Sequence, residues 1–324
     1  MPVRSRADTR LLAKVSQLYY LQNLTQQQIA DRLRLSRPGV SRLLETARQQ
    51  GIVQISVVTD DGAAGDLEGA LEKRFGLREA VVTASGPDGG APGGRLGAAA
   101  AEYLHRTMAP GTTVGLSWGT TLHEMVRAVR PEVYDGSTVV QMLGGVGPVQ
   151  HDAHATDLAR RLAVLLGAEL RLIQAPGIVA TSAVRRALLE DPQIHRVVDA
   201  VADVDVAFVG VGALSTNPLL APGAGGGVVP DGLGGRLAAA GAVGDVALRF
   251  FDAAGAPVPS PLDDRIVGVA LAALAALPHV VGVAGGAGKA EAIRAALRAG
   301  LLDVLITDAD TAAAVLDDGG PDGP

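Results

Sequence analysis

The sequence predicts an α/β protein in two parts: a small helical unit at the N-terminus, and a larger Rossmann-like unit with a mostly parallel sheet. The chain of 324 residues is long enough for two domains, each with its own core. Apolar residues recur at helical spacing near the N-terminus. Short apolar runs then alternate with helical stretches, as strands and crossover helices do.

The composition is that of a folded protein without a secretion or membrane signal. Hydrophobic residues make up 48% of the chain and charged residues 19%. The absence of cysteine excludes disulfides, thiolate metal sites and cysteine nucleophiles. No apolar signal core follows the N-terminal arginines, and the unbroken apolar run Ile266–Leu277 is shorter than the roughly 18–20 residues of a membrane span. We expect a cytoplasmic protein with no membrane partner, and a buried helix followed by a buried strand across Ile266–Ala287.

Charge is distributed unevenly along the chain. Residues 1–58 carry nine Lys and Arg against three Asp and Glu, whereas the remainder carries 19 against 31. This asymmetry predicts that the N-terminal end binds a polyanion and that the rest of the chain does not.

Three helices are predicted in the N-terminal unit. Arg10–Asn23 has one apolar face, and a second helix begins after Thr25, where Gln28 can complete a capping box. A three-residue turn leads to Ser36, which suits the N-cap of a third helix with Pro38 in its first turn. Two short helices joined by a tight turn, the second with polar residues at its exposed start, form the arrangement that enters the DNA major groove.

The outer face of the third helix is polar and basic. Arginine can bind guanine edges or phosphates, and serine suits phosphate. After Gly51, the alternation of Ile52–Val57 predicts the strand of a wing. We therefore expect a winged helix-turn-helix that binds double-stranded operator DNA; the alternative is a three-helix dimerisation or protein-docking module. The expected DNA-binding residues are Thr25, Gln26, Ser36, Arg37, Pro38, Gly39, Ser41 and Arg42.

Three blocks of this unit have a distinctive sequence and spacing: LTQQQIA at 24–30, LSRPGVSRLL at 35–44 and ARQQGIV at 47–53. They resemble the DNA-binding head of the SorC family of sugar-binding transcription regulators. The last block and its distance from the turn make the pattern more specific than a generic helix-turn-helix. The resemblance implies a transcription regulator that forms homo-oligomers, with a tetramer as the expected state.

The remaining sequence predicts an open, mostly parallel sheet with helices on both faces. The expected strands are 113–116, 138–143, 170–173, 204–211, 280–284 and 304–307. The expected helices are 96–108, 121–129, 156–166, 184–190, 287–299 and 311–316, after a linking helix at 67–75. In such sheets ligands bind beyond the carboxyl ends of the strands.

Two strand-to-helix junctions suit an anion. In Val114–Leu122, hydroxyls, a glycine and the start of a helix form a plausible cradle, although an ordinary capped turn has the same pattern. Gly282–Ala290 is rich in glycine and contains Lys289, the only lysine in the second half of the chain. It is not a nucleotide-binding P-loop, because Val283 replaces the first glycine and Ala290 replaces the magnesium-binding hydroxyl. Lys289 is either an anion ligand or a surface lysine.

Seven segments of the larger unit, 115–122, 139–145, 244–247, 250–252, 263–265, 285–290 and 305–308, also resemble the SorC family. The effector domain of that family is similar to sugar-phosphate isomerases and glucosamine-6-phosphate deaminases. The resemblance implies that the Ser117–Thr121 loop and Lys289 hold an effector phosphate and that Asp245 approaches the sugar. For a sugar or sugar-phosphate effector, the implied binding residues are Ser117, Gly119, Thr120, Thr121, Gln141, Asp245 and Lys289.

An isomerase or deaminase carrying a DNA-binding head is the alternative function. Such an enzyme needs a positioned acid or base near its sugar, and the strand end Val209–Leu214 has neither Asp nor His. His151 and His154, with Asp152 and Asp157 nearby, have a spacing that can bind metal or transfer protons, but a polar helix start explains them equally well. We therefore expect no catalytic residue, no metal and no cofactor.

The expected domain boundaries follow from these patterns. Residues 1–60 form the DNA-binding domain, residues 61–318 the effector-binding and oligomerisation domain, and residues 319–324 a disordered tail. Residues 85–94 and 221–227 are rich in glycine and predict loops; the second has no indicated role beyond mobility.

Overall fold

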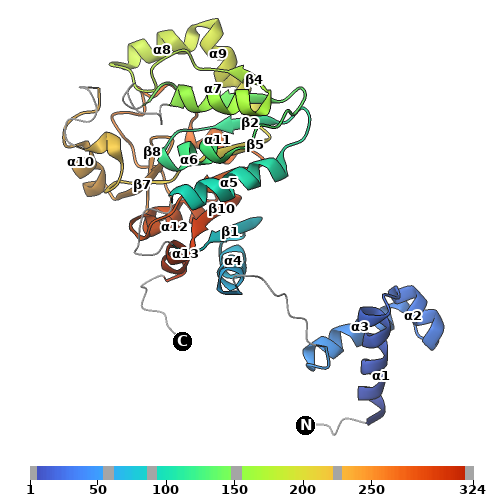
Figure 1. The fold of residues 1–324 in the computed structure, drawn as a ribbon. Helices are drawn as coiled ribbons and strands as arrows, with labels where there is room; N and C mark the ends of the chain where they lie inside the picture. Colours follow the sequence, from blue (N-terminus) through green and yellow to red (C-terminus); the bar gives the residue numbers. More distant parts are fainter. Residues whose placement is uncertain (1–5, 54–61, 86–92, 147–154, 222–227, 318–324) are drawn as a thin grey trace. The chain divides into compact units, whose positions relative to one another are not determined.

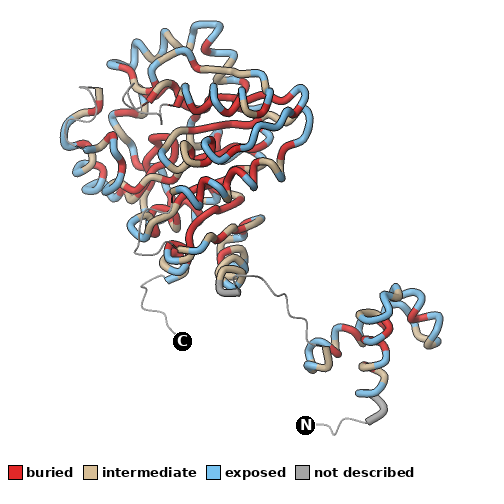
Figure 2. Tube along the Cα trace, viewed as in Figure 1, coloured by how far each residue is buried: buried red, intermediate tan, exposed pale blue. Residues whose placement is uncertain are grey.

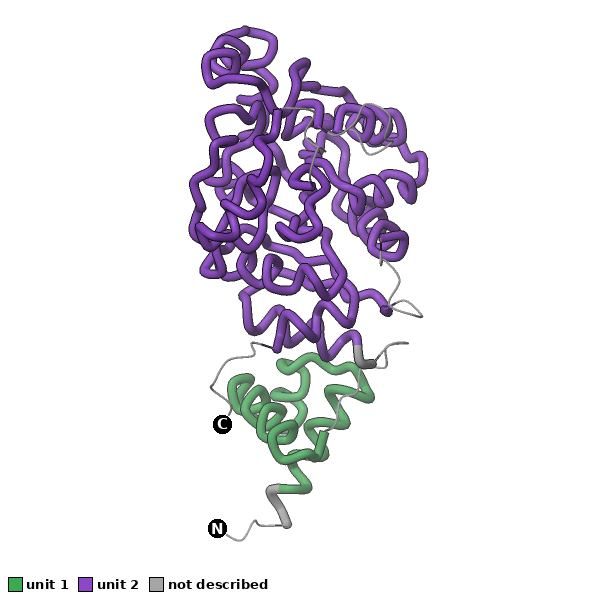
Figure 3. Tube along the Cα trace, turned by 90° about the vertical axis from the view of Figure 1, so that its left-hand side faces the viewer, with its two compact units in different colours: residues 1–60 green, residues 61–324 purple. Residues whose placement is uncertain are grey.

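The computed structural model describes residues 6–53, 62–85, 93–146, 155–221 and 228–317. The chain forms two compact units, residues 1–60 and residues 61–324 (Figure 3). Most of the two predicted glycine-rich loops and the whole predicted tail lie outside the described residues.

The N-terminal unit contains the predicted helix-turn-helix (Figure 1). Thr25 caps the second helix and completes the capping box with Gln28. Ser36 caps the third helix by accepting the backbone N–H of Gly39 over 3.1 Å, with Pro38 in the first turn. The elements are α1 (Arg6–Ser16), the π-helical turn η1 (Gln17–Leu21), α2 (Gln26–Leu33) and α3 (Arg37–Gln49).

A small apolar core holds these helices together. Its buried members are Val15, Leu18, Ile29, Ala30, Val40 and Leu44. The predicted wing begins differently from expectation, because Ile52 and Val53 form bends and both backbone N–H groups bond to the carbonyl of Ala47. Residues 54–57 of the wing lie outside the described residues.

The larger unit is built on a seven-stranded parallel sheet, which confirms the predicted fold class (Figure 1). The strand order is β1-β10-β9-β5-β2-β3-β4, and each neighbouring pair is parallel. The strands are β1 (Glu79–Thr83), β2 (Thr113–Leu116), β3 (Thr138–Gln141), β4 (Glu169–Arg171), β5 (Val206–Val209), β9 (Val280–Val283) and β10 (Val304–Asp308).

Helices cover both faces of the sheet, and the strands between them consist mostly of buried residues (Figure 2). The first face carries α5, α6 and α7 around a core that includes Leu104 and Leu122. The opposite face carries α4, α12 and α13 around Leu71, Ile293 and Val315. The helices are α4 (Gly62–Phe75), α5 (Gly93–Thr107), α6 (Thr120–Ala128), α7 (Ala155–Leu166), α8 (Ser182–Glu190), α9 (Pro192–Asp199), η3 (Ala200–Asp203), η4 (Pro218–Leu220), α10 (Leu233–Ala239), α11 (Leu271–Ala275), η5 (Ala287–Lys289), α12 (Ala290–Arg298) and α13 (Ala309–Leu316).

A three-stranded antiparallel sheet, which the sequence did not reveal, is inserted between β5 and β9. Its order is β6 (Gly212–Ala213), β7 (Ala242–Val246) and β8 (Arg249–Asp252). The helix predicted over Ile266–Leu277 is wrong in extent, because only Leu271–Ala275 is helical. Ile266 instead pairs with Ile178, beyond β4. Residues 267–269 pair with the chain beyond β3, where the N–H of Val269 bonds to the carbonyl of Met142 over 2.8 Å. Within the described residues, no helix is long and apolar enough to span a membrane.

β2 and β5 are neighbours from which the chain leaves in opposite directions. After β2 it continues to β3 and β4 at one edge, and after β5 it continues to β9 and β10 on the other side. In open α/β sheets such a switch point marks the crevice where ligands bind, beyond the carboxyl ends of the two strands. The Ser117–Thr121 loop follows β2, and the Lys289 segment follows β9, with β5 between them. The two junctions singled out in the sequence therefore flank the switch point.

Candidate functional site

The exposed face of α3 carries the candidate DNA-binding side chains. Arg37, Pro38, Ser41 and Arg42 are exposed, while Val40 on the opposite side is fully buried. The spacing of the apolar residues therefore turns the basic, hydroxyl-bearing start of the helix outward, as a helix that enters the major groove requires.

The capping residues already have structural partners. The hydroxyl of Thr25 accepts the N–H of Gln28, and that of Ser36 accepts the N–H of Gly39. Both residues are exposed, but the hydroxyl of Thr25 already donates to Oε1 of Gln28 over 3.1 Å. The hydroxyl of Ser36 can still donate to a phosphate oxygen. Gln26 and Gly39 are half-buried.

Two tyrosines border this face and were not among the predicted residues. Tyr19 and Tyr20 lie on the π-helical turn with their ring centroids 4.9 Å apart. A surface depression of about 850 Å³ lies between them, the start of α2 and Arg37, and a smaller one extends to Arg42. The signal was present as the pair Tyr19-Tyr20 within the first predicted helix, Arg10–Asn23.

The first effector loop follows β2. Ser117 is buried, and its N–H bonds to the carbonyl of Phe208 on β5 over 3.0 Å, which ties the loop to the switch point. Gly119 has a φ of 138°, a conformation that other residues rarely adopt, and α6 starts directly after it. Thr120 is exposed and Thr121 half-buried in the first turn of that helix. Hydroxyls and unpaired N–H groups at a helix start suit an anion.

The second loop is held from β10 and α13. The N–H of Gly286, which has a φ of 100°, lies 2.9 Å from a carboxylate oxygen of Asp308 and 2.7 Å from the hydroxyl of Thr311. Lys289 follows at the junction of η5 and α12. Burial lowers the pKa of Lys289, and the negative charge of Asp245 partly opposes that change. Lys289 is half-buried, so its ammonium is partly desolvated, and a bound anion would stabilise its charged form.

Asp245 is a buried carboxylate on β7, beside the carboxyl end of β5. Its Oδ1 accepts the side-chain amide of Asn217 over 2.9 Å, and its Oδ2 accepts the N–H of Leu248 over 3.0 Å. Gly212 makes room for it, since a Cβ there would lie 2.3 Å from Oδ1. Burial raises the pKa of Asp245, while these two hydrogen bonds and the charge of Lys289 lower it.

Gln141 is fully buried at the end of β3. Its amide donates to the hydroxyl of Thr156 over 3.3 Å and accepts the N–H of Ile173 over 3.1 Å. These two bonds fix the orientation of the amide. His151, His154 and Asp152 lie outside the described residues, and within the described chain no group of three metal-ligating side chains comes together.

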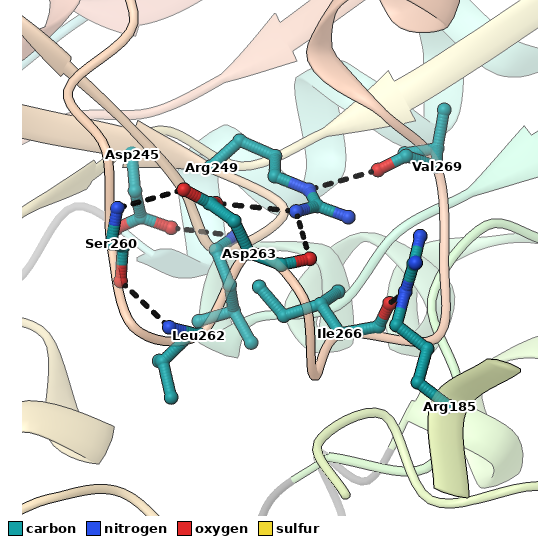
Figure 4. Close-up of polar contacts among 9 residues, drawn as sticks. Arg185, Asp245, Arg249, Ser260, Leu262, Asp263, Ile266 and Val269 are labelled. Carbon is teal, nitrogen blue, oxygen red and sulfur yellow. Dashed lines mark hydrogen bonds and ion pairs between the residues drawn. The ribbon is translucent and has the colours of Figure 1, made fainter. Parts of the chain in front are cut away.

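Arg249 is a buried cation that the sequence analysis did not select. Its Nη1 lies 3.2 Å from Oδ1 and 3.1 Å from the carbonyl of Asp263, and its Nε lies 3.4 Å from the carbonyl of Val269 (Figure 4). Burial lowers the pKa of Arg249, the carboxylate of Asp263 raises it, and the positive charge of Arg185 lowers it. Arg249 thereby fastens residues 263–269 to β8. An arginine within the apolar run 246–251 was the available signal.

Comparison with known proteins agrees with this architecture. Residues 62–317 match the family model described as "Putative sugar-binding domain". The deoxyribonucleoside regulator of Bacillus subtilis (strain 168) is 33% identical over 320 residues, which cover 97% of this chain and 99% of that protein. The sorbitol operon regulator of Klebsiella pneumoniae is 31% identical over 319 residues, which cover 95% and 98%. The crystal structure of that full-length regulator, SorC, matches with a TM-score of 0.73 and 28% identity, covering 96% of this chain and 100% of that one.

A helix-turn-helix joined to a ligand-binding α/β unit defines a transcription regulator with a small-molecule-binding domain. The chain belongs to the SorC family of transcription regulators, whose larger domain is a sugar-binding domain.

Proposed function

We propose that this protein is a DNA-binding regulator of carbohydrate-metabolism genes, acting as a repressor or activator under the control of a phosphorylated sugar or a related polyol. The observation that supports the proposal most strongly is the switch point between β2 and β5. A hydroxyl-bearing loop follows β2 and a half-buried lysine follows β9, on either side of β5. That combination suits an anionic head on a polar ligand.

Each predicted side chain has a distinct task in this proposal. Ser117, Thr120 and Thr121 orient the phosphate through hydroxyl and backbone N–H groups, with Gly119 allowing close approach. Lys289 supplies the compensating charge. Asp245, held by two hydrogen bonds, accepts a sugar hydroxyl.

The arrangement does not favour an isomerase or deaminase. Asp245 accepts hydrogen bonds from Asn217 and Leu248, and both bonds stabilise its ionised form and so weaken it as a base. The strand end Gly210–Leu214 carries no acid or base. General acid–base chemistry needs such a group within hydrogen-bond reach of the substrate. We propose that the protein binds its sugar without converting it.

The proposed regulator acts in the cytoplasm as a homo-oligomer, with a tetramer as the expected state. An effector can change DNA affinity only if it prefers one arrangement of the protein over another. Subunits that move relative to one another would supply such arrangements.

The test is a binding experiment with the full chain and the DNA upstream of its own gene, across a panel of sugar phosphates and their dephosphorylated forms. We expect operator binding that one phosphorylated sugar alters and its dephosphorylated form does not. Operator binding that no sugar, polyol or sugar phosphate alters would contradict the proposed control.

A further inference from the structure

The free edge of the parallel sheet borders a groove that the proposed function does not use. β4 is the last strand of the sheet, and in the described part of the chain no strand pairs with its outer side. A groove of about 740 Å³ lies between this strand and the helices α8 and α9. Both helices lie near β4 in Figure 1. The helices contribute Leu188, Ile194 and Arg196 to its lining.

The backbone of Leu170, the middle residue of β4, faces this open side. Glu169 donates its N–H inward, to the carbonyl of Ser137 over 2.8 Å. Because hydrogen-bonding groups alternate along a strand, the N–H and C=O of Leu170 point away from β3. An edge with such groups is a template for another strand.

We propose that this edge binds β4 of a second copy of the chain, antiparallel, across a two-fold axis at Leu170. In that register the two Leu170 residues exchange both backbone hydrogen bonds. Glu169 of each copy then lies opposite Arg171 of the other, on the same face of the sheet. The side chains of Glu169 and Arg171 form an ion pair within the chain, with Oε1 of Glu169 3.5 Å from Nε of Arg171. Because they are 67% and 39% exposed, each can exchange or share that partner with its counterpart in the second copy. The strand is therefore complementary to itself, as a two-fold interface requires.

The neighbouring helix extends this surface. α8 buries none of its own residues, and its Val184 is 44% exposed. Amphipathic helices in a finished fold usually place their apolar stripe against a partner. In the proposed dimer the α8–α9 pairs lie beside the joined strands and add apolar contact to the two hydrogen bonds.

The same helix is tied to the effector domain's ligand end. Nε of Arg185, on α8, donates to the carbonyl of Ile266 over 2.7 Å (Figure 4). Residues 267–269 in turn pair with the chain beyond β3, where the N–H of Gly144 bonds to the carbonyl of Val267 over 2.9 Å. This connection gives an effector-induced movement at the strand ends a physical route to the interface.

The inference rests on the proposed function only in requiring a homo-oligomer. Charge reversal tests the pairing of Glu169 with Arg171 of the second copy directly. Glu169→Arg and Arg171→Glu each place like charges opposite one another twice, whereas the double variant E169R/R171E restores opposite charges. Analytical ultracentrifugation measures the dissociation constant of each assembly step. We expect this constant to rise by about tenfold for one step in each single variant and to return to the wild-type value in the double variant. The matched control, Glu102→Arg on α5, should assemble as the wild type does.

Cross-linking supplies an independent measurement, because the chain has no cysteine of its own. Facing residues of a hydrogen-bonded antiparallel pair have Cα atoms about 5.5 Å apart, within the range that a disulfide spans. Leu170→Cys should therefore form a covalent dimer on mild oxidation, and Glu102→Cys should not.

The outcomes separate this inference from the proposed function. An oligomer whose single charge variants assemble normally, or whose double variant stays dissociated, overturns the β4 interface alone. So does a wild-type monomer that still binds operator under effector control. A wild type that neither assembles nor binds operator overturns both.

Discussion

The side-chain amide of Asn217 donates a 2.9 Å hydrogen bond to the buried carboxylate of Asp245. Asn217 is itself buried, and its Oδ1 accepts the N–H of Leu219 over 3.0 Å. Asn217, the N-cap residue of η4, therefore holds the carboxylate of Asp245 in one orientation next to the switch point. Its orientation depends on a residue 28 positions away in the sequence.

We predict that Asn217→Ala weakens effector binding and destabilises the effector domain by about 1–3 kcal/mol, because a buried carboxylate loses a donor. Asn217→Asp should be worse at neutral pH, since two carboxylates then face one another and disfavour ionisation. Denaturant unfolding measures the stability. Fluorescence of Trp118, the only tryptophan, reports effector binding because it lies in the Ser117–Thr121 loop. Wild-type effector affinity in both variants would show that Asp245 does not contact the ligand.

The sequence predicted the parallel sheet because its strands are continuous apolar runs bounded by glycine and polar residues. It predicted the two anion junctions because each follows such a run directly. The antiparallel sheet escaped notice because β6 has only two residues, Gly212 and Ala213, and β7 alternates weakly. Asn217 carries no local signal of its role, and the only local signal for Arg249 is its position within an apolar run. Their partners, Asp245, Asp263 and Val269, are brought to them only by the tertiary fold.

The N-terminal half of α3 should carry the DNA affinity. Where the arginine binds a guanine, Arg37→Ala or Arg42→Ala should weaken operator binding by about 1–3 kcal/mol. Where it binds a phosphate, the substitution should reduce the slope of log affinity against log salt concentration by about one. Arg48→Ala, at the far end of the same helix, is the matched control and should change operator binding little. Gel-shift titrations at several salt concentrations distinguish the two kinds of contact. Normal operator binding by both variants would show that a different surface contacts the DNA.

We expect no turnover of pentose, hexose or amino-sugar phosphates by the purified protein. The reason is that the Gly210–Leu214 strand end offers no acid or base, and the hydrogen bonds from Asn217 and Leu248 weaken Asp245 as a base. Product formation is measured by coupled assay or NMR. Turnover that Asp245→Asn or His154→Ala abolishes would establish the enzyme alternative.

Binding of a phosphate should consume protons at alkaline pH. Burial lowers the pKa of Lys289 below its ordinary value of 10.5, so the free protein loses this proton earlier than a solvated lysine does. A bound anion favours the ammonium and raises that pKa again. The affinity for phosphate is therefore highest below the pKa of Lys289 in the free protein, and it falls as the pH rises through that pKa. Calorimetry in buffers of different ionisation enthalpy should show proton uptake in that window. The uptake should disappear in Lys289→Met; its persistence there would assign the titration to another group.

Removing the Lys289 charge should separate effector binding from DNA binding. Lys289→Ala is expected to weaken binding of the phosphorylated effector by about 1.5–3 kcal/mol, the value of a hydrogen bond to a charged group. The effector response should weaken in parallel, while effector-free operator binding stays near normal, because the lysine lies in the larger unit. The measurement is calorimetry on wild type and variant with the phosphorylated effector and its dephosphorylated form. Lys289→Arg serves as the matched variant, since it keeps the positive charge but changes its shape and should retain part of the affinity. Equal wild-type affinity for the two ligand forms would rule out the phosphate and leave a neutral sugar or polyol as the effector.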